Sequence, residues 1–445
     1  MKTSIQFINH ASVIIKGTNI SLLSDPWYQG DAFNKGWNLL YEISDYQIMN
    51  ILNKVTHIWI SHEHPDHFSI SFFKKFSNQI IQRKIKILFQ EKKDKRVVAF
   101  LKNILLDCVE LGNNVKLKLD EDFSVTCIQS GFYDSALLVT NKNEKILNLN
   151  DCDITNISQA KDIFSKTGEV DVLLTQFSYA AWKGGVENKK WRVHAASEKL
   201  NTIELQLSIF KPKFVIPFAS FIYFSNNQNF YLNDSTNKPI DVINRFKECQ
   251  SDIIIMKFND IFDGKFSDFS NENALEFWNQ HYNSISQKIT NTYTTINFEK
   301  INNSFNNYCA RISINNNMIF ISLIRLISPI NFFNPVIVRI LDLNITVKFD
   351  YVSKKIEQSK EVPMICLHSE SLNFLFNNSY GFDTLTVNGC FEEGRVGGFI
   401  ATTKSLAIEN LNNLGISVAP SIIFNFSIIK KFIIILFRVA RKLAT

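Results

Sequence analysis

The stretch Thr56–Ser69, with the sequence THIWISHEHPDHFS, constrains the fold of this chain more than any other. It predicts a short apolar strand that runs into a polar loop. Histidines two positions apart on an extended backbone point to the same side, and Pro65 fixes a turn after which a further Asp-His pair can face a neighbouring position. Four potential metal ligands therefore lie within six residues: His62, His64, Asp66 and His67. The pattern predicts a site for two metal ions at the end of a strand.

The residue types suit such a site. Neutral imidazole binds zinc and iron, and a carboxylate adds the negative charge that retains a divalent ion. Two ions about 3.5–4 Å apart lower the pKa of a shared water and stabilise negative charge that develops on oxygen. Asp66 is also placed to orient or deprotonate that water. The alternative is a surface loop without metal, but five of the eight histidines fall within the first 67 residues.

Sequences on both sides of the loop extend the pattern. They are INHASVIIKG (Ile8–Gly17), LLSDPWYQGDAFNKGW (Leu22–Trp37), ILNLNDCD (Ile146–Asp153) and IPFASFIYFS (Ile216–Ser225). Together with the loop they resemble the metallo-β-lactamase fold, and within it the β-lactamase-like domain of CMP-N-acetylneuraminate hydroxylases. More distantly they resemble N-acyl-phosphatidylethanolamine phospholipase D and ascorbate-6-phosphate lactonase. The resemblance covers about residues 4–260 and implies an α/β fold, the four-layer αββα sandwich.

The resemblance implies a ligand set by position. His62 and His64 would hold one ion, Asp66 and His67 the other, and Asp151 would bridge both from the end of a strand. Asp153 is a weaker alternative for the bridge.

Two residues near the start of the chain would support these ligands. In the families that the chain resembles, the histidine of the opening strand, here His10, and the aspartate of the Asp-Pro dipeptide, here Asp25, lie close to the metals. A carboxylate there would orient a metal-binding imidazole and raise its basicity. The alternatives are an ordinary strand histidine and a turn aspartate.

Two histidines that the superfamily usually supplies are absent. No histidine occurs between the signature loop and His194, and the segment SGFYDS in that interval offers Tyr133 or Asp134 as an oxygen ligand. Asn226 stands where the last histidine would be. Oxygen donors favour iron or manganese over zinc. We therefore expect two divalent ions, either zinc or iron or manganese.

The segment SYAAWKGGVENKKW (Ser178–Trp191) is rich in aromatic and basic residues. Such a loop above a metal site predicts a substrate lid. The residues expected to contact a substrate are Trp182, Lys183, Lys189, Lys190 and Arg192. The alternative is a solvated run of charge.

The remaining sequence suggests three regions and a cytoplasmic location. Residues 1–264 are predicted to form the metal-binding domain, and residues 270–420 a smaller α+β domain with strands at Cys309–Ile321 and Val336–Tyr351. The segment 369–393 loosely resembles sterol-carrier-like lipid-binding domains. The seven cysteines include no C-x-x-C pair, which indicates a reducing compartment. The first residues lack the apolar core of a signal peptide.

Residues 421–445 predict a basic amphipathic helix. At 100° per residue, all its cations fall on one face of about 120°, opposite an apolar face. These cations are Lys430, Lys431, Arg438, Arg441 and Lys442. Such a helix would lie on an anionic membrane surface, here the inner face of the membrane, unless it docks on the smaller domain. The tail supplies most of the net charge of +6, so a nucleic-acid partner is not expected.

Three functions fit these features. The leading one is a metal-dependent hydrolase that uses a metal-bound hydroxide on a phosphorylated sugar, a sugar nucleotide or a lipid-linked substrate. The second is a di-iron oxygenase that hydroxylates a CMP-sialic-acid-like sugar nucleotide with a separate electron donor, because the paired Cys-x-His motifs of a Rieske centre are absent. The third is a catalytically silent metal- or lipid-binding protein.

Overall fold

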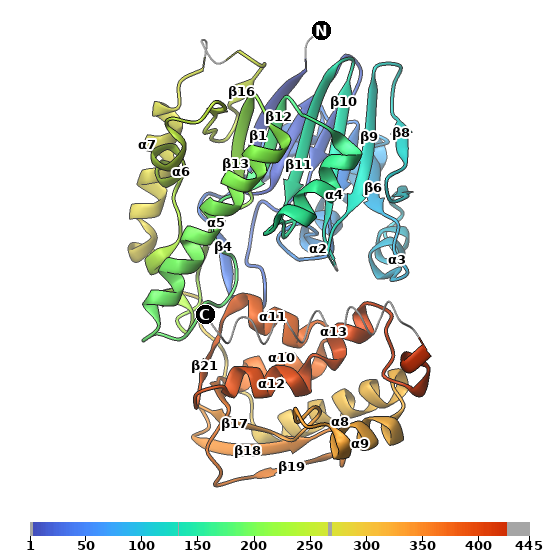
Figure 1. Cartoon of the computed structure of the whole chain (residues 1–445), viewed down its shortest axis with the longest axis vertical. Helices are drawn as coiled ribbons and strands as arrows, with labels where there is room; N and C mark the ends of the chain where they lie inside the picture. Colours follow the sequence, from blue (N-terminus) through green and yellow to red (C-terminus); the bar gives the residue numbers. More distant parts are fainter. Residues whose placement is uncertain (1–2, 132, 266–268, 425–445) are drawn as a thin grey trace.

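The computed structural model describes residues 3–131, 133–265 and 269–424, which form two domains stacked along the long axis of the molecule (Figure 1). The cations predicted for the tail lie outside the described residues. The first domain contains two seven-stranded sheets and a two-stranded antiparallel sheet of β4 (Trp37–Leu39) and β14 (Ile222–Phe224), and the second domain contains one sheet of five strands.

The first sheet of the first domain has the strand order β16-β1-β2-β3-β5-β6-β7. Its strands are β1 (Ser4–Asn9), β2 (Ser12–Lys16), β3 (Ser21–Ser24), β5 (His57–Ile60), β6 (Lys86–Gln90), β7 (Cys108–Leu111) and β16 (Ile261–Phe262). Strands β3, β5, β6 and β7 run parallel to one another. Apolar side chains of α1 (Asp45–Leu52), α2 (Ile70–Gln82) and α3 (Arg96–Asn103) cover the outer face of this sheet.

The second sheet has the order β15-β13-β12-β11-β10-β9-β8. Its strands are β8 (Lys116–Lys118), β9 (Phe123–Gln129), β10 (Ser135–Asn141), β11 (Glu144–Asn150), β12 (Val172–Gln176), β13 (Phe214–Phe218) and β15 (Asp252–Ile253). Strands β8 to β11 form an antiparallel meander, and β11, β12, β13 and β15 are parallel. Helices α4 (Ile157–Thr167) and α5 (Lys189–Phe210) cover its outer face.

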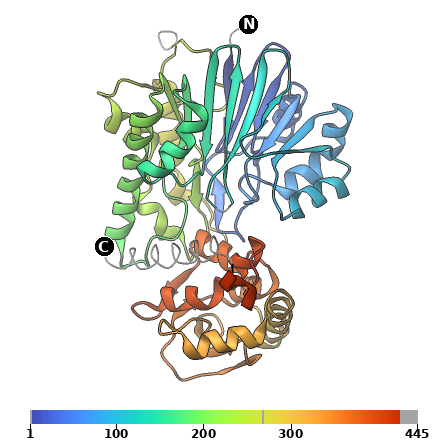
Figure 2. The ribbon, with the colours of Figure 1, turned by 45° about the vertical axis from the view of Figure 1, so that its right-hand side comes forward.

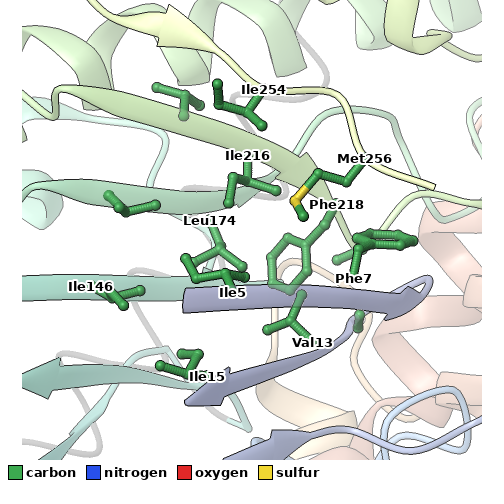
Figure 3. Close-up of a cluster of buried hydrophobic side chains, with 14 of the residues drawn as sticks. Ile5, Phe7, Val13, Ile15, Ile146, Leu174, Ile216, Phe218, Ile254 and Met256 are labelled. Atoms are coloured by element: carbon green, nitrogen blue, oxygen red, sulfur yellow. The ribbon is translucent and has the colours of Figure 1, made fainter. Parts of the chain in front are cut away.

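The inner faces of the two sheets share one apolar core. Ile5, Phe7 and Val13 of the first sheet meet Leu174 and Phe218 of the second in the same cluster (Figure 3). Alternating residues of each strand point into this core because successive side chains of a strand face opposite sides of the sheet. The predicted four-layer αββα sandwich is confirmed.

The first domain extends further along the chain than the predicted limit at Gly264. Helix α7 (Glu272–Asn283) follows α6 (Pro239–Phe246), and its residues Trp278 and Tyr282 belong to the core of the sandwich. The ring of Trp278 stacks on Phe221 at 3.9 Å, and its Nε1 donates to the carbonyl of Met256 at 2.8 Å. The sequence missed this because the polar segment before α7 resembles a linker.

The second domain has the strand order β19-β18-β17-β20-β21. Its strands are β17 (Val336–Ile340), β18 (Ile345–Asp350), β19 (Lys355–Gln358), β20 (Ile365–Leu367) and β21 (Phe391–Glu393). Its helices are α8 (Phe298–Asn315), α9 (Met318–Ile327), α10 (Ser369–Asn377), α11 (Gly381–Asn388), α12 (Gly398–Leu406) and α13 (Ile408–Asn413). The predicted α+β class of this domain is confirmed, and its likeness to sterol-carrier domains stays a prediction.

The predicted strand Cys309–Ile321 is wrong, because this segment contains the end of α8 and the start of α9. Buried residues of α8 recur every three or four positions, as Ile301, Phe305, Cys309 and Ile312 do, which is the period of a helix. The side chain of Asn317 then caps α9 by accepting from the backbone N–H of Phe320. Among the described residues no helix is both long and apolar enough to cross a bilayer.

The two domains contact each other at α11, among other places. Helix α11 lies on the side of the second domain that faces the sandwich (Figures 1 and 2). The backbone N–H of Trp182 donates to the carbonyl of Thr386 at 3.0 Å, and Asn388 Nδ2 donates to the carbonyl of Phe33 at 3.0 Å. A helix of the second domain is thus fixed against the loops at one end of the sandwich.

We predict that Trp278→Ala destabilises the chain by about 3–5 kcal/mol, because it removes a large buried aromatic side chain and leaves a cavity. Denaturant unfolding of the full chain, followed by a probe of the sandwich domain, measures this change. The control is Ile289→Ala, because Ile289 is 94% exposed and its truncation should change stability by less than about 0.5 kcal/mol. Equal stability of the two variants would contradict the inclusion of α7 in the first domain.

Candidate metal centre

The candidate site lies where several strands of both sheets end. Asp25 follows β3, the signature loop follows β5, and Asp151 follows β11. Because parallel strands end at one edge of their sheet, the residues that follow them lie close together. Three non-glycine residues here have positive φ: His10 (28°), Asp25 (37°) and Asn150 (53°). Such conformations cost about 1–3 kcal/mol each and cluster at functional sites.

The carboxylate of Asp25 orients two of the histidines, His67 and His62. It accepts from the backbone N–H of Ser61 at 2.8 Å, from Ser61 Oγ at 2.8 Å and from Asn150 Nδ2 at 3.0 Å. His67 Nδ1 lies 3.0 Å from Asp25 Oδ2, and His62 Nδ1 lies 3.0 Å from Ser61 Oγ. Burial raises the pKa of Asp25, and the bonds from His67 and Ser61 oppose this shift. The buried carboxylate of Asp25 thereby fixes His67 Nδ1 directly and His62 Nδ1 through Ser61.

The inner nitrogens of the same rings converge. His62 Nε2 lies 2.8 Å from His64 Nδ1, while His67 Nε2 lies 3.1 Å from Asp66 Oδ2 and 3.2 Å from Asp151 Oδ2. Two overlapping sets offer ligand atoms within 4.8 Å of one another. One set is His62, His67 and Asp151, and the other is His10, Asp66 and His67.

The donors present fit divalent metal ions. Asp66 Oδ1 is buried and has no hydrogen-bond partner in the described part of the chain, and the same holds for His10 Nδ1. An unpaired carboxylate oxygen at such a position costs free energy unless a cation or another donor satisfies it. Imidazole nitrogens and carboxylate oxygens are ligands for zinc, iron and manganese.

The structure brings Asp134 to the cluster and turns Asn226 away from it. Asp134 Oδ1 lies 3.7 Å from His62 Nε2, and burial raises the pKa of Asp134 to about 7. Asn226 Oδ1 instead accepts from the backbone N–H of Gln228, and its Nδ2 donates to the carbonyl of Lys35 at 3.4 Å. Its side chain serves its own loop, so the expectation that Asn226 replaces a ligand is not supported.

Tyr133 lies beside the cluster. Its ring centroid is 5.9 Å from that of His64, and its hydroxyl group is buried without a partner among the described residues. Burial raises the pKa of this phenol, so Tyr133 stays protonated near neutral pH. A protonated phenol is a poor metal ligand and a good hydrogen-bond donor.

The electric field of the site favours cations. Burial alone would lower the pKa of His67, but Asp66, Asp151 and Asp25 hold it well above its usual range. The pKa of His64 is raised to about 9, because Asp383 outweighs the effect of burial. Burial would raise the pKa of Asp66, but the charge of His67 keeps it well below its usual range. The negative charge that retains a proton on these histidines would also attract a divalent ion.

His62 differs from the other two histidines. Burial and the neighbouring His67 and His64 hold its pKa well below the usual range. His62 therefore stays neutral, the state in which imidazole binds metal.

Two residues that the sequence did not indicate also contact the cluster. Asp383 of α11 places Oδ2 3.2 Å from His64 Nε2. Gln176, the last residue of β12, donates from Nε2 to Asp151 Oδ1 at 3.2 Å. Neither belongs to a motif, and Asp383 lies 319 positions from His64, so no local pattern connects them.

Two of the predicted lid residues have other roles. Trp182 is 5% exposed and packs on Phe391 and Phe399 of the second domain, with ring centroids 4.7 and 4.8 Å away. Arg192 is 1% exposed and donates to both carboxylate oxygens of Asp234 at 2.8 Å. Both side chains are buried in packing or ion-pair contacts, which corrects the prediction that they contact a substrate.

The lysines of this segment differ from one another. Lys189 and Lys190 are exposed in the first turn of α5, and Lys183 is partly buried. A contact between these lysines and a substrate stays a prediction. His194, also on α5, is exposed and lies 3.6 Å from Glu198, away from the cluster described above.

We predict that zinc affinity falls at least tenfold for each pH unit below pH 8.5, down to about pH 6.5. The pKa of His64 is about 9 in the metal-free protein, so below that pH a bound ion displaces at least one proton. Competition with a chromogenic chelator at each pH measures the affinity, with the chelator alone as control. An affinity that does not change with pH would contradict the charged state of His64.

Parts of the chain are similar to known proteins. Residues 4–176 match the model of the beta-lactamase superfamily domain. The cytidine monophosphate-N-acetylneuraminic acid hydroxylase of Cricetulus griseus is 27% identical over 269 residues, which cover 56% of this chain and 45% of the hydroxylase. The protein of the same name from Xenopus laevis is 25% identical over 255 residues, covering 53% of this chain and 41% of its own length. The matched part thus spans less than half of either relative.

Solved structures with a similar arrangement include proteins of two kinds. CmlA, a diiron β-hydroxylase from Streptomyces venezuelae, has a TM-score of 0.44 and 12% identity, covering 59% of this chain and 54% of its own. Igni18, a metallo hydrolase from Ignicoccus hospitalis, has a TM-score of 0.41 and 11% identity, covering 59% of this chain and 98% of its own.

Proposed function

We propose that this chain is a metal-dependent hydrolase with a two-metal centre, and the match of residues 4–176 to the beta-lactamase superfamily domain supports this. One observation carries the proposal. The inner nitrogens of His62, His64 and His67 converge, while the outer nitrogen of each ring has an oxygen atom within about hydrogen-bond distance. Rings held in this way are preorganised for ligation.

In the assignment that we propose, the ligands form two groups that share one carboxylate. His62 and His64, with Asp134, would hold one ion. Asp66 and His67 would hold the other. Asp151 would bridge both, oriented by the hydrogen bond from Gln176. When bound, two divalent ions supply Lewis acidity and lower the pKa of a bound water.

Asp66 would orient the attacking water. Its pKa is held well below the usual range by His67, and its Oδ2 lies 3.4 Å from His10 Nε2. An ionised carboxylate at this position accepts a hydrogen bond from water, which suits the orienting role.

The proposed substrate is a phosphorylated sugar, a sugar nucleotide or a lipid-linked sugar. The support is the name of the relatives, which act on a cytidine monophosphate sugar. Hydrolysis needs only water and groups that the site holds, which favours it as the leading reaction.

A di-iron oxygenase is the second candidate. Two observations favour it. The carboxylate of Asp134 lies 3.7 Å from His62 Nε2, and oxygen donors favour iron. The curated relatives are also named hydroxylases. This reaction would require electrons from a separate donor protein.

We predict that the chain, purified without added metal or chelator, contains about two equivalents of metal. The double variant His64→Ala, His67→Ala should retain little, because it removes one ligand from each proposed group. Elemental analysis measures both. Glu198→Ala is the control, since Glu198 is exposed on α5 beside His194 and outside the cluster. Little metal in the wild-type chain would indicate a silent protein and contradict the proposal.

The identity of the metal and the need for a reductant separate the two reactions. Zinc or manganese, with cleavage of bis(p-nitrophenyl) phosphate or a sugar nucleotide in the absence of reductant, supports hydrolysis. Iron, with oxygen consumption that depends on a reductant and a CMP-sugar, supports the oxygenase and overturns the hydrolase.

We also propose that the chain associates peripherally with anionic membranes. The sequence of the tail supplies five cations, each of which contributes on the order of 1 kcal/mol near such a surface. A second feature supports the proposal within the second domain. One face of α9 exposes four apolar side chains: Ile319 (84%), Leu323 (49%), Leu326 (83%) and Ile327 (67%).

We predict that the full chain sediments with vesicles that contain 30% phosphatidylglycerol and not with pure phosphatidylcholine vesicles. Deletion of residues 421–445 should abolish this binding, and high salt should weaken it, because the attraction is electrostatic. An unchanged bound fraction after the deletion would eliminate the tail as the membrane anchor.

A further inference from the structure

We propose that Asp383, carried by the second domain, is a positioning residue of the metal centre in the first domain. This inference rests on the proposed function, because it concerns how His64 presents itself to a metal ion. The bond that carries it joins His64 Nε2 and Asp383 Oδ2 at 3.2 Å.

The contacts of His64 assign different roles to its two ring nitrogens. A neutral imidazole carries one N–H, and the nitrogen without it has the lone pair that binds metal. When the ring is neutral, Asp383 accepts from Nε2–H, so the lone pair is left on Nδ1, which lies 2.8 Å from His62 Nε2. Asp383 thereby selects the tautomer in which the lone pair of Nδ1 points into the cluster.

His67 has the same arrangement with a different carboxylate. Its Nδ1 lies 3.0 Å from Asp25 Oδ2, and its Nε2 faces Asp66 and Asp151. Asp25 belongs to the first domain, whereas Asp383 comes from α11. In the part of the chain that the structure describes, Asp383 is the one acceptor bonded to His64 Nε2.

The remaining surroundings of His64 do not offer a substitute. The ring of Phe33 lies edge-on at 5.6 Å, and the ring of Tyr133 lies at 5.9 Å. The side chains of His64 and Asp383 are 22% and 16% exposed, so water competes only partly for the bond. Loss of Asp383 would leave His64 free to rotate or to change its tautomer.

Hydrogen bonds at both ends hold α11 against the first domain, which fixes the position of the Asp383 side chain. Asn388, at its end, donates to the carbonyl of Phe33, and Asn229 Nδ2 donates back to the carbonyl of Asn388 at 2.6 Å. At the other end Arg96 donates to the hydroxyl of Tyr380 at 2.6 Å, and that hydroxyl donates to Asp94 at 3.1 Å. These contacts join α11 to the first domain on both sides of Asp383.

The consequence is a composite metal centre. The first domain supplies the metal-binding atoms, and the second domain orients one of them. Carboxylates that orient a metal-binding histidine typically raise metal affinity 10–100-fold.

The test compares three variants of the full chain, with Co²⁺ as the probe. Asp383→Ala removes the acceptor, and Asp383→Asn keeps a neutral acceptor in nearly the same volume. Tyr380→Phe is the matched control, because it weakens the same domain contact without touching His64. Chelator competition gives the affinity, saturation gives the stoichiometry, and visible absorption of bound Co²⁺ reports the ligand geometry. Thermal unfolding verifies that each variant is folded.

We expect Asp383→Ala to weaken Co²⁺ binding 10–100-fold and to change the absorption spectrum, with two equivalents still bound at saturation. Asp383→Asn should show a smaller loss, and Tyr380→Phe should stay within about twofold of wild type.

Three results would overturn the proposal. They are wild-type affinity in both Asp383 variants, an equal loss in Tyr380→Phe, and a fall to one equivalent at saturation in Asp383→Ala. The last result would make Asp383 a direct ligand. Failure of the proposed function is distinguishable, because the wild-type chain itself would then bind no Co²⁺.

Discussion

The buried carboxylate of Asp25 is the group on which the geometry of the site depends. It accepts bonds from the backbone N–H and the hydroxyl of Ser61, from Asn150 and from His67. Through Ser61 it also fixes His62. A buried charge without such partners would be very costly, and with them it holds two imidazoles in one orientation. Asp25 itself has a positive φ of 37°, a strained backbone conformation.

The rest of the fold supports that arrangement. The facing sheets bury a continuous apolar core (Figure 3). Such a close-packed core is rigid and holds the loops at the strand ends in place. The loops also meet the second domain, where Trp182 packs on Phe391 and Phe399 and α11 brings Asp383 to His64. The second domain is therefore part of the environment of the site. Its removal would expose apolar surface and leave His64 Nε2 without the carboxylate of Asp383.

Much of the first domain follows from local sequence. The apolar runs before Asp25, His62 and Asp151 form the predicted strands, and the signature loop forms beside them as expected. Predictions failed where a segment depended on partners far along the chain. Cys309–Ile321 is an exception, because its helical period and the Asn317 cap are local signals that the strand prediction missed. Trp182 and Arg192 are buried because distant residues, Phe391 and Asp234, meet them.

The sequence by itself determined the kind of chemistry, because His62, His64, Asp66 and His67 lie within six residues and their spacing fixes which side each faces. It also offered Tyr133 or Asp134 as an oxygen donor in place of a missing histidine. Only the tertiary structure decided that Asp134 reaches His62, that Asn226 does not take part, and that Asp383 holds His64. The physical reason is distance along the chain. Local spacing specifies the direction of a side chain, whereas contacts between residues hundreds of positions apart arise only when separate apolar surfaces pack together.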